Sequence, residues 1–220
     1  MSSDTDPFIA PVCHHEIEII AQDDDLLLIN KPSGLLSLSG KHPLNKDSVH
    51  YRLVQDFPSA TLLHRLDLGT SGIMVVALNK AVNGDLTKQF QNRTVAKKYE
   101  AILQGVLSLD EGIIDFPIAK GEFPLQVICS QTGKLAQSHY RVIERLDDNR
   151  TRVEFTPLTG RTHQLRIHSR EIGHPILGCD LYFSGDSFVK ADRLMLHATQ
   201  LDFVHPVSGE NISGRCPSPF

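Results

Sequence analysis

Short apolar segments separated by turn residues limit the fold of this chain more than any other feature. Residues 26–30 (LLLIN) and 73–78 (IMVVAL) are continuous apolar runs with the length and composition of buried β-strands. Residues 16–21 (EIEIIA) alternate as a half-buried strand does, and KPSG at 31–34 supplies a turn. The first third of the chain is therefore predicted to contain several strands.

Helical spacing occurs in two neighbouring segments. Val49, Leu53 and Phe57 recur every four residues and predict a helix that ends before Pro58. A second helix is predicted from Val82, Leu86 and Phe90, which follow Asn79 as a suitable N-cap.

The second half of the chain also favours strands. Strand-like composition is found in KKYEAIL, HYRVIE and TRVEFT, and the closing strands are predicted in RLMLHATQL and DFVHP. One more helix is predicted from Thr162 as N-cap, with Leu165 and Ile172 on one face, Arg166 and Arg170 on a polar face, and Gly173 at its end. Many strands with about three helices and no repeated βαβ pattern predict an α+β fold.

Composition narrows the class of protein. The chain has 220 residues, a hydrophobic fraction of 40% and a net charge of −4, and no apolar run approaches the length that spans a bilayer. The start of the chain lacks the pattern of a signal peptide, so we expect a cytoplasmic protein. The four cysteines are scattered without a C-x-x-C pair, which favours reduced, incidental thiols. We expect a short tail at residues 1–15 and one domain, of a size typical of catalytic domains, at residues 16–220.

The stretch LLHRLDLGTSGIMVVAL at 62–78 places a charged segment between apolar ones. Asp67 should lie on a loop between two buried strands, where a rigid sheet fixes a side chain and leaves it reachable. The alternative is that Asp67 only shapes the turn by accepting hydrogen bonds from the region of Thr70 and Ser71. The residues alone favour that alternative.

Several motifs in one order resemble the RluA-type pseudouridine synthases. These are NKPSGLLS at 30–37, HRLD with TSG from residue 64, KKY at 97–99, LTGRTHQLRIH at 158–168 and HPILG at 174–178. Within the family the chain resembles the short members that modify both large-subunit ribosomal RNA and transfer RNA. The resemblance covers nearly the whole chain and leaves no extra N-terminal RNA-binding domain.

This resemblance implies an α+β fold built on a bent, mixed and mostly antiparallel sheet, with flanking helices and a central catalytic cleft. It implies that uridine in RNA is detached from its ribose at nitrogen, rotated and rejoined through carbon 5. The product is an isomer of the substrate, so no cofactor, metal or energy source is expected. The expected partner is RNA, and the expected oligomeric state is a monomer.

The same resemblance assigns the catalytic residues. Asp67 is the implied nucleophile, attacking either the ribose or the pyrimidine ring, and Arg161 is its implied partner. A guanidinium can orient a carboxylate and keep it charged in a low-dielectric site. Tyr99 is implied to pack on the target base and is a candidate for removing the carbon-5 proton, although a phenol with a pKa near 10 is a poor base. The alternative for Tyr99 is a core residue of a strand.

Further residues are implied to bind RNA. Arg65 is placed to fill the space that a flipped uridine vacates, for which the alternative is a surface salt bridge. His64 is expected to fix the loop or to approach RNA, and Leu165 to form a wall of the pocket or part of the core.

Two basic stretches extend the predicted RNA-binding surface. Residues 88–98 carry Lys88, Arg93, Lys97 and Lys98, and residues 161–170 carry Arg161, Arg166 and Arg170, with no acid in either. We expect them to follow RNA phosphates, with Lys97, Lys98 and Arg166 in contact. A solvated helix face is the alternative reading of such runs.

Two segments depart from the family pattern. Cys179 stands in GCDLY, where relatives usually read GD after HPILG, and AQSHYRV replaces a more common acidic and Thr-containing version. We expect these changes to affect which RNA fits, and the shape of the loop that leads to Tyr182, rather than the chemistry.

Rival functions fit the residues less well. A metal-dependent hydrolase is disfavoured because His163 and His168 are five residues apart and no H-E-x-x-H motif occurs among the eleven histidines. A glycosidase is disfavoured because Asp67 has arginines, not a second acid, as its expected neighbours. A non-catalytic RNA-binding module remains as an alternative.

Overall fold

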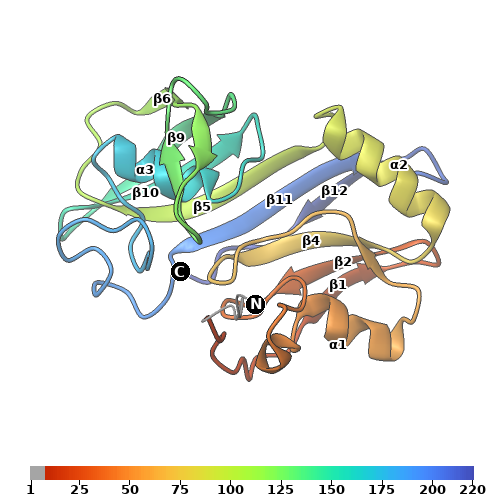
Figure 1. The fold of residues 1–220 in the computed structure, drawn as a ribbon. Helices are drawn as coiled ribbons and strands as arrows, with labels where there is room; N and C mark the ends of the chain where they lie inside the picture. Colours follow the sequence, from red (N-terminus) through yellow and green to blue (C-terminus); the bar gives the residue numbers. More distant parts are fainter. Residues whose placement is uncertain (1–7) are drawn as a thin grey trace. The chain divides into compact units, whose positions relative to one another are not determined.

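The computed structural model describes residues 8–220, which form two compact units (Figure 1). Of the described residues, unit 1 contains 8–95 and Leu201–Pro217, and unit 2 contains Ala96–Gln200 and Ser218–Phe220. Strand β11 (Leu196–Val204) contributes residues 196–200 to unit 2 and 201–204 to unit 1. Residues 1–7 of the predicted tail lie outside the described part.

Unit 1 is built on an antiparallel set of strands that provides its apolar core. The strands are β1 (Glu18–Gln22), β2 (Leu26–Lys31), β3 (Thr61–Leu62), β4 (Ser71–Ala77) and β12 (Asn211–Arg215). β2 pairs with β4 from Leu26 opposite Ala77 to Lys31 opposite Gly72, and all seven residues of β4 are buried. The two continuous apolar runs of the sequence are therefore confirmed as central strands.

Strand β1 differs from its prediction in burial. It pairs with β2, but its side chains are mostly exposed, and Ile19 is 43% exposed. The register shifts between Ile19 and Ala21, so the alternation of apolar residues is not kept on one face.

The predicted helices of unit 1 are confirmed. α1 (Val49–Asp56) begins after Ser48, whose hydroxyl accepts the Tyr51 N–H, and it ends before Pro58. α2 (Lys80–Gln91) begins after Asn79, whose Oδ1 accepts the Val82 N–H at 3.0 Å. A 3-10 helix, η1 (Pro43–Asn45), precedes α1. Each cap satisfies a backbone donor that the helix itself leaves unpaired.

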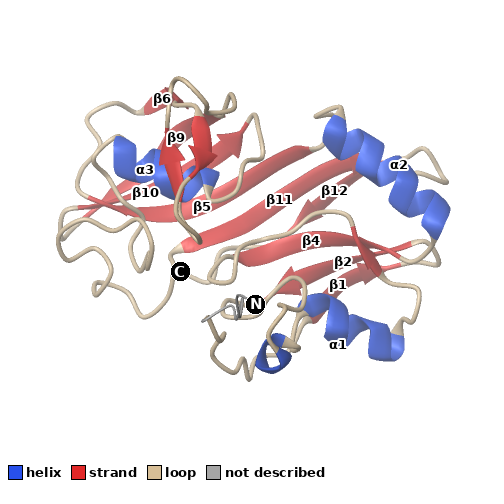
Figure 2. Ribbon diagram, in the orientation of Figure 1, coloured by secondary structure: helices blue, strands red, loops and turns tan. Residues whose placement is uncertain are grey.

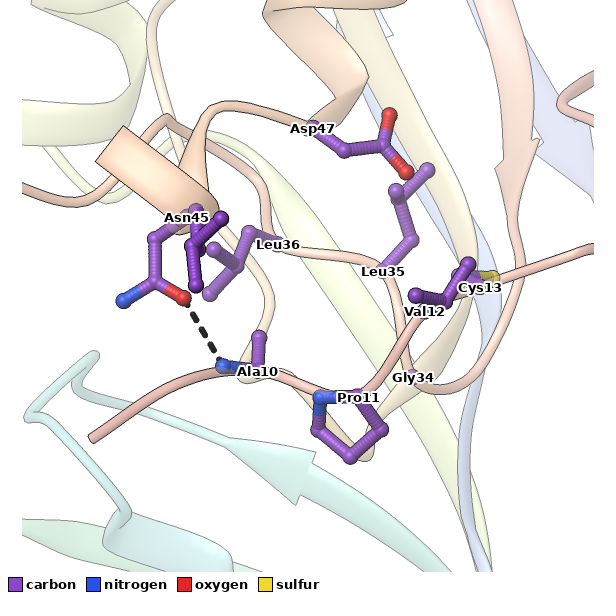
Figure 3. Close-up of a pocket in the computed structure, with 10 residues that line it drawn as sticks. Ala10, Pro11, Val12, Cys13, Gly34, Leu35, Leu36, Asn45 and Asp47 are labelled. Atoms are coloured by element: carbon purple, nitrogen blue, oxygen red, sulfur yellow. Dashed lines mark hydrogen bonds between the residues drawn. The ribbon is translucent and has the colours of Figure 1, made fainter. Parts of the chain in front are cut away.

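The described part of the N-terminal segment is bound to unit 1 through two side chains. The buried amide of Asn45 accepts the Ala10 N–H and donates to the Phe8 carbonyl, each at 2.8 Å. Arg52 donates to the carbonyls of Cys13 and His15 at 2.6 Å. Figure 3 shows the small pocket that this segment lines, about 60 Å³ in volume, with Asn45 and Ala10 at one side.

Unit 2 is also mainly antiparallel. Its strands are β5 (Ala96–Gln104), β6 (Glu111–Asp115), β7 (Ile118–Lys120), β8 (Gln126–Ile128), β9 (Gln137–Leu146) and β10 (Arg150–Pro157), and its helix is α3 (Gln164–Glu171). β10 pairs with both β5 and β9, β6 pairs with β9, and β7 and β8 form a separate hairpin. Phe155, Val153, Leu103 and Ile167 are fully buried members of its core.

Two predictions for unit 2 are corrected. The N-cap of α3 is His163 rather than Thr162; His163 has a left-handed φ of 56° and makes no side-chain cap. The segments RLMLHATQL and DFVHP form the single strand β11 rather than two strands. No glycine or proline interrupts residues 193–205, so nothing in the backbone ends a strand there.

The α+β class and the mostly antiparallel sheet are confirmed (Figure 2). Residues 8–220 contain three α-helices, and none of these described helices is long and apolar enough to cross a membrane.

Candidate active site

Asp67 lies in the loop between β3 and β4 of unit 1 and is half-buried. The turn that follows is closed by the backbone, since the Thr70 N–H donates to the Asp67 carbonyl at 3.1 Å. Leu66, the residue before Asp67, is buried and bonded by the Ser37 hydroxyl, which donates to its carbonyl at 2.7 Å and accepts its N–H at 3.2 Å. The backbone is thus fixed immediately before the carboxylate.

The backbone after Asp67 is held by the KPSG turn. The Leu68 carbonyl accepts the Gly34 N–H at 2.8 Å and the Lys31 Nζ at 3.2 Å. Gly34 has a φ of 82°, a conformation that favours glycine. Ser33 donates its hydroxyl to the Gly69 carbonyl at 2.7 Å. The KPSG turn is therefore a brace for the loop that carries Asp67.

Lys31 was not predicted to have a structural role. Its side chain is fully buried, and Nζ also donates to the carbonyls of Pro32 and Leu35, at 2.9 and 2.7 Å. A buried ammonium is stable only when its donors are satisfied. Here they join the turn at 31–35 to the loop that carries Asp67.

His64 and Arg65 belong to the same loop but have different environments. The His64 ring is half-buried, accepts the Val75 N–H at its Nε2 and stacks on Phe90. Arg65 is exposed, and among residues 8–220 its guanidinium makes no hydrogen bond or ion pair. The surface salt bridge considered for Arg65 is therefore absent from the described part of the chain.

Tyr99, Lys97 and Lys98 lie on β5 of unit 2. Tyr99 is half-buried, pairs with Phe155 in the strand register and packs against the core of the unit. Lys98 Nζ lies 3.1 Å from Glu154 Oε1, which Arg141 also approaches. Burial alone would raise the pKa of Glu154, but the hydrogen bonds and charges of Lys98 and Arg141 outweigh it, so the pKa lies below its ordinary value. Lys98 is thus already paired before any RNA is bound.

The segment around α3 brings Arg161, Leu165 and Arg166 together. Arg161 is half-buried and donates its Nε to the Leu135 carbonyl at 3.0 Å. Leu165 is buried in the core of unit 2. Arg166 is only 4% exposed, so the prediction that it lies on a polar face with Arg170 is corrected.

The contacts of Arg166 involve the segment that departs from the family pattern. Its Nη2 is ion-paired with Asp180, and its Nε donates to Cys179 Sγ at 3.4 Å. Its guanidinium also lies 5.4 Å from the centroid of the Tyr182 ring. Cys179, which departs from the family pattern, is therefore in direct contact with Arg166, a predicted RNA-binding residue.

A buried network of polar side chains links α3 to β9 and to the segment before the helix, and it was not predicted from the sequence. Gln164 Oε1 accepts the Thr159 hydroxyl and the Arg161 N–H, at 2.7 and 2.9 Å. Its Nε2 donates to Ser138 Oγ, which lies 3.0 Å from His168 Nδ1. In the sequence, only the polar residues Gln164 and His168 within the predicted helix could have indicated this network.

His168 makes the stability of the protein pH-dependent. It is fully buried, and burial lowers its pKa. The unfolded chain therefore binds a proton more readily, so the stabilising contribution is present above the unfolded pKa of about 6.5 and is lost as pH falls below it.

We expect the free energy of unfolding in urea to fall between pH 7.5 and pH 5.5, with a slope that is reduced in His168→Gln. His50→Gln on α1 is the matched control and should keep the wild-type slope. An unchanged slope in His168→Gln would contradict the assignment.

Comparisons with known proteins identify the family. Residues 25–171 match the family model of RNA pseudouridylate synthase. The chain belongs to this family. It is 47% identical over 204 residues to the dual-specificity RNA pseudouridine synthase RluA of Yersinia pestis, covering 92% of this chain and 99% of that protein. The same-named protein of Escherichia coli strain K12 is 45% identical over 92% of this chain and 93% of its own length.

Solved structures agree with this assignment. Human RNA Pseudouridylate Synthase Domain Containing 1 superposes with a TM-score of 0.79 and 30% identity, covering 96% of this chain and 86% of that chain. Human RNA Pseudouridylate Synthase Domain Containing 4 gives a TM-score of 0.71 and 27% identity, covering 92% and 88%. The predicted family and fold are confirmed, and this pseudouridine synthase is an isomerase that acts on RNA.

Three side chains of this pseudouridine synthase could in principle hold a cation. Ligand atoms of Asp23, Asp25 and His205 lie within 4.8 Å of one another. The His205 ring is already occupied, however: Nδ1 accepts the N–H groups of Val207 and Ser208, and Nε2 lies 3.1 Å from Asp23 Oδ2. We therefore interpret the cluster as hydrogen bonding that shapes a turn.

Proposed function

We propose that this pseudouridine synthase isomerises specific uridines in large-subunit ribosomal RNA and transfer RNA. The observation that carries the proposal is the similarity, over 92% of the chain, to proteins named as dual-specificity RNA pseudouridine synthases. The two RNA classes come from the resemblance of the chain to the short members of the family.

In the proposed mechanism the Asp67 carboxylate is the nucleophile. It adds to the anomeric carbon of the ribose or to the pyrimidine ring, and the bond between N1 and the ribose breaks. The base rotates, its carbon 5 bonds to the ribose, and the hydrogen of carbon 5 leaves to water while N1 is protonated. Asp67 is regenerated, because a carboxylate adduct can break again. The braced, half-buried loop supports this role, since the scaffold fixes the carboxylate in advance.

Arg161 is proposed to orient the Asp67 carboxylate, and Tyr99 to pack on the target base. Arg161 uses its Nε for Leu135, and its terminal nitrogens have no hydrogen bond among residues 8–220, which leaves donors for a carboxylate. Arg166 is a second candidate for this role because it is buried, and ion pairs are less screened where water is excluded.

The variants Arg161→Met and Arg166→Met distinguish the two arginines. Loss of the arginine that orients the nucleophile should lower kcat with little change in KM, because the carboxylate then samples unproductive orientations. A kcat that stays near the wild-type value in Arg161→Met and falls in Arg166→Met would reverse the assignment.

Arg65 is proposed to fill the space left by the flipped uridine. Flipping costs a few kcal/mol in a stacked base and less in a flexible one. We therefore expect Arg65→Ala to lower the rate on a folded stem-loop roughly tenfold, and less on the same RNA with its stem opened by mismatches. Lys80→Ala, an exposed cation of unit 1, is the control. Equal losses on both RNAs would contradict the wedge role.

We also propose that the enzyme acts as a monomer in the cytoplasm, without a cofactor, and that residues 16–220 form its catalytic domain. His64, Leu165, Lys97, Lys98 and Arg166 are proposed to contribute to RNA binding. The alternative function, a non-catalytic RNA-binding module of the same fold, predicts binding without any change in the RNA.

The experiment that tests the substrates is direct mapping. Unmodified large-subunit ribosomal RNA and transfer RNA are incubated with the enzyme, treated with a carbodiimide that marks pseudouridine, and read by primer extension. We expect one or a few enzyme-dependent stops in each RNA. Stops in one RNA class only would exclude dual specificity, and binding without stops would favour the non-catalytic module.

A further inference from the structure

The His64 imidazole replaces a strand partner at the point where β3 leaves β4. Only Thr61 and Leu62 of β3 pair with β4, opposite Ala77 and Val76. The next residue of β4, Val75, donates its N–H to His64 Nε2 at 3.1 Å. A buried amide left without an acceptor is costly, so the side chain satisfies the donor that β3 no longer covers.

A second contact holds the same ring by its face. The rings of His64 and Phe90 are stacked, with centroids 4.7 Å apart and an interplanar angle of 21°. Phe90 lies in the last turn of α2, a helix that packs against β4 (Figure 1). The imidazole is therefore restrained in its plane by a hydrogen bond and across its plane by an aromatic ring.

The hydrogen bond defines the protonation state of His64. A nitrogen that accepts a hydrogen bond carries no proton, so the ring is neutral with its proton on Nδ1. While the bond to Val75 is present, His64 is neither a cation for RNA phosphates nor a general acid. Its contribution to RNA binding is thus expected to be indirect.

Arg65, which is proposed to fill the space left by the flipped uridine, follows His64 directly in the sequence. Its guanidinium has no hydrogen bond or ion pair among residues 8–220, so in the free protein its position depends on the backbone. That backbone is anchored on one side by His64 and on the other by Leu66, which Ser37 holds. Arg65 is thus flanked by two anchored residues.

We propose that Phe90 is a positioning residue, which acts through His64 to fix the backbone that carries Arg65. This inference rests on the proposed function, because it assigns Phe90 to the flipping of the target uridine. Loss of the aromatic face leaves His64 free to rotate away from Val75, and the loop then samples orientations in which Arg65 cannot enter the RNA stack.

The test compares three substitutions in unit 1. Phe90→Leu removes the aromatic face, Phe90→Tyr keeps it, and Phe57→Leu, at another half-buried phenylalanine, is the matched control. The first measurement needs no RNA: amide hydrogen exchange at Val75. We expect exchange to be at least about tenfold faster in Phe90→Leu and near wild type in Phe90→Tyr and Phe57→Leu.

The second measurement is the rate of tritium release from uridine labelled at carbon 5, on a folded stem-loop and on the same RNA with its stem opened. We expect kcat in Phe90→Leu to fall roughly tenfold on the folded RNA with a smaller effect on KM, and Phe90→Tyr to restore it. The double variant Phe90→Leu with Arg65→Ala should lose no more than Arg65→Ala alone, because both changes remove one function.

Two outcomes would overturn the proposal: unchanged Val75 exchange in Phe90→Leu, or faster exchange with wild-type rates on both RNAs. Absence of release from the wild-type enzyme would count against the proposed substrates instead, while the exchange measurement would still decide whether Phe90 fixes His64.

Discussion

Asp67→Asn is expected to abolish turnover while leaving the fold and RNA affinity nearly unchanged. The amide has almost the same shape as the carboxylate, but it is a far weaker nucleophile. Removal of a nucleophile commonly lowers kcat by about 10⁴-fold or more. The backbone around residue 67 is held by Ser37, Gly34 and Lys31 through main-chain groups, so the substitution should leave the loop in place.

The measurement is the single-turnover rate with excess enzyme, together with urea unfolding and RNA binding. Asp56→Asn, at the exposed end of α1, is the matched control and should keep the wild-type rate. A folded Asp67→Asn enzyme that turns over at more than a small fraction of the wild-type rate would exclude Asp67 as the nucleophile.

Lys31→Met is expected to cause the largest loss of stability among single changes near the site. Lys31 Nζ donates to three carbonyls, those of Pro32, Leu35 and Leu68. Methionine fills a similar volume but donates nothing, so these acceptors lose their charged partner. Hydrogen bonds to charged groups contribute about 1.5–3 kcal/mol each and are not additive, so we expect a loss of roughly 3 kcal/mol.

Urea unfolding measures this loss, and the exposed residue Lys80 provides the control, since Lys80→Met should change the free energy of unfolding by less than about 0.5 kcal/mol. Turnover should also fall, because the Leu68 carbonyl adjoins Asp67. If Lys31→Met changed the free energy of unfolding no more than Lys80→Met does, the KPSG turn would be shown to hold the loop without the Lys31 side chain.

Local patterns in the sequence were sufficient for most elements. The runs at 26–30 and 73–78 form β2 and β4, the N-cap Asn79 begins α2, and α1 ends before Pro58, all as predicted. These features depend on residues that are close in sequence, such as a side chain that accepts an amide three positions away. They also placed Asp67 correctly on a loop between strands.

Features that depend on distant residues were not predicted. α3 begins one residue later than expected, where His163 Nδ1 lies 2.8 Å from the hydroxyl of Tyr182. Arg166 is buried because Asp180 and Cys179 contact it from a segment more than ten residues away. A helical spacing of four cannot reveal such partners, because it describes one helix in isolation.

The brace beneath Asp67 illustrates the same limit. KPSG was identified as a turn, which is confirmed, but the buried state of Lys31 was not foreseen, since lysine is rarely fully buried. The lysine is explained only by the carbonyls that the fold brings around it. The hydrogen bond from the Val75 N–H to His64 could not be predicted either, because it depends on the fact that β3 ends at Leu62.

The central claim, that Asp67 drives the isomerisation of uridine, is tested most directly by tritium release from RNA labelled at carbon 5. Wild-type enzyme and Asp67→Asn are each given labelled large-subunit ribosomal RNA and transfer RNA. Forming the bond at carbon 5 must expel that hydrogen to water, so we expect release by the wild type and none above background by Asp67→Asn. Equal release by both proteins, or release by neither from either RNA, would contradict the account.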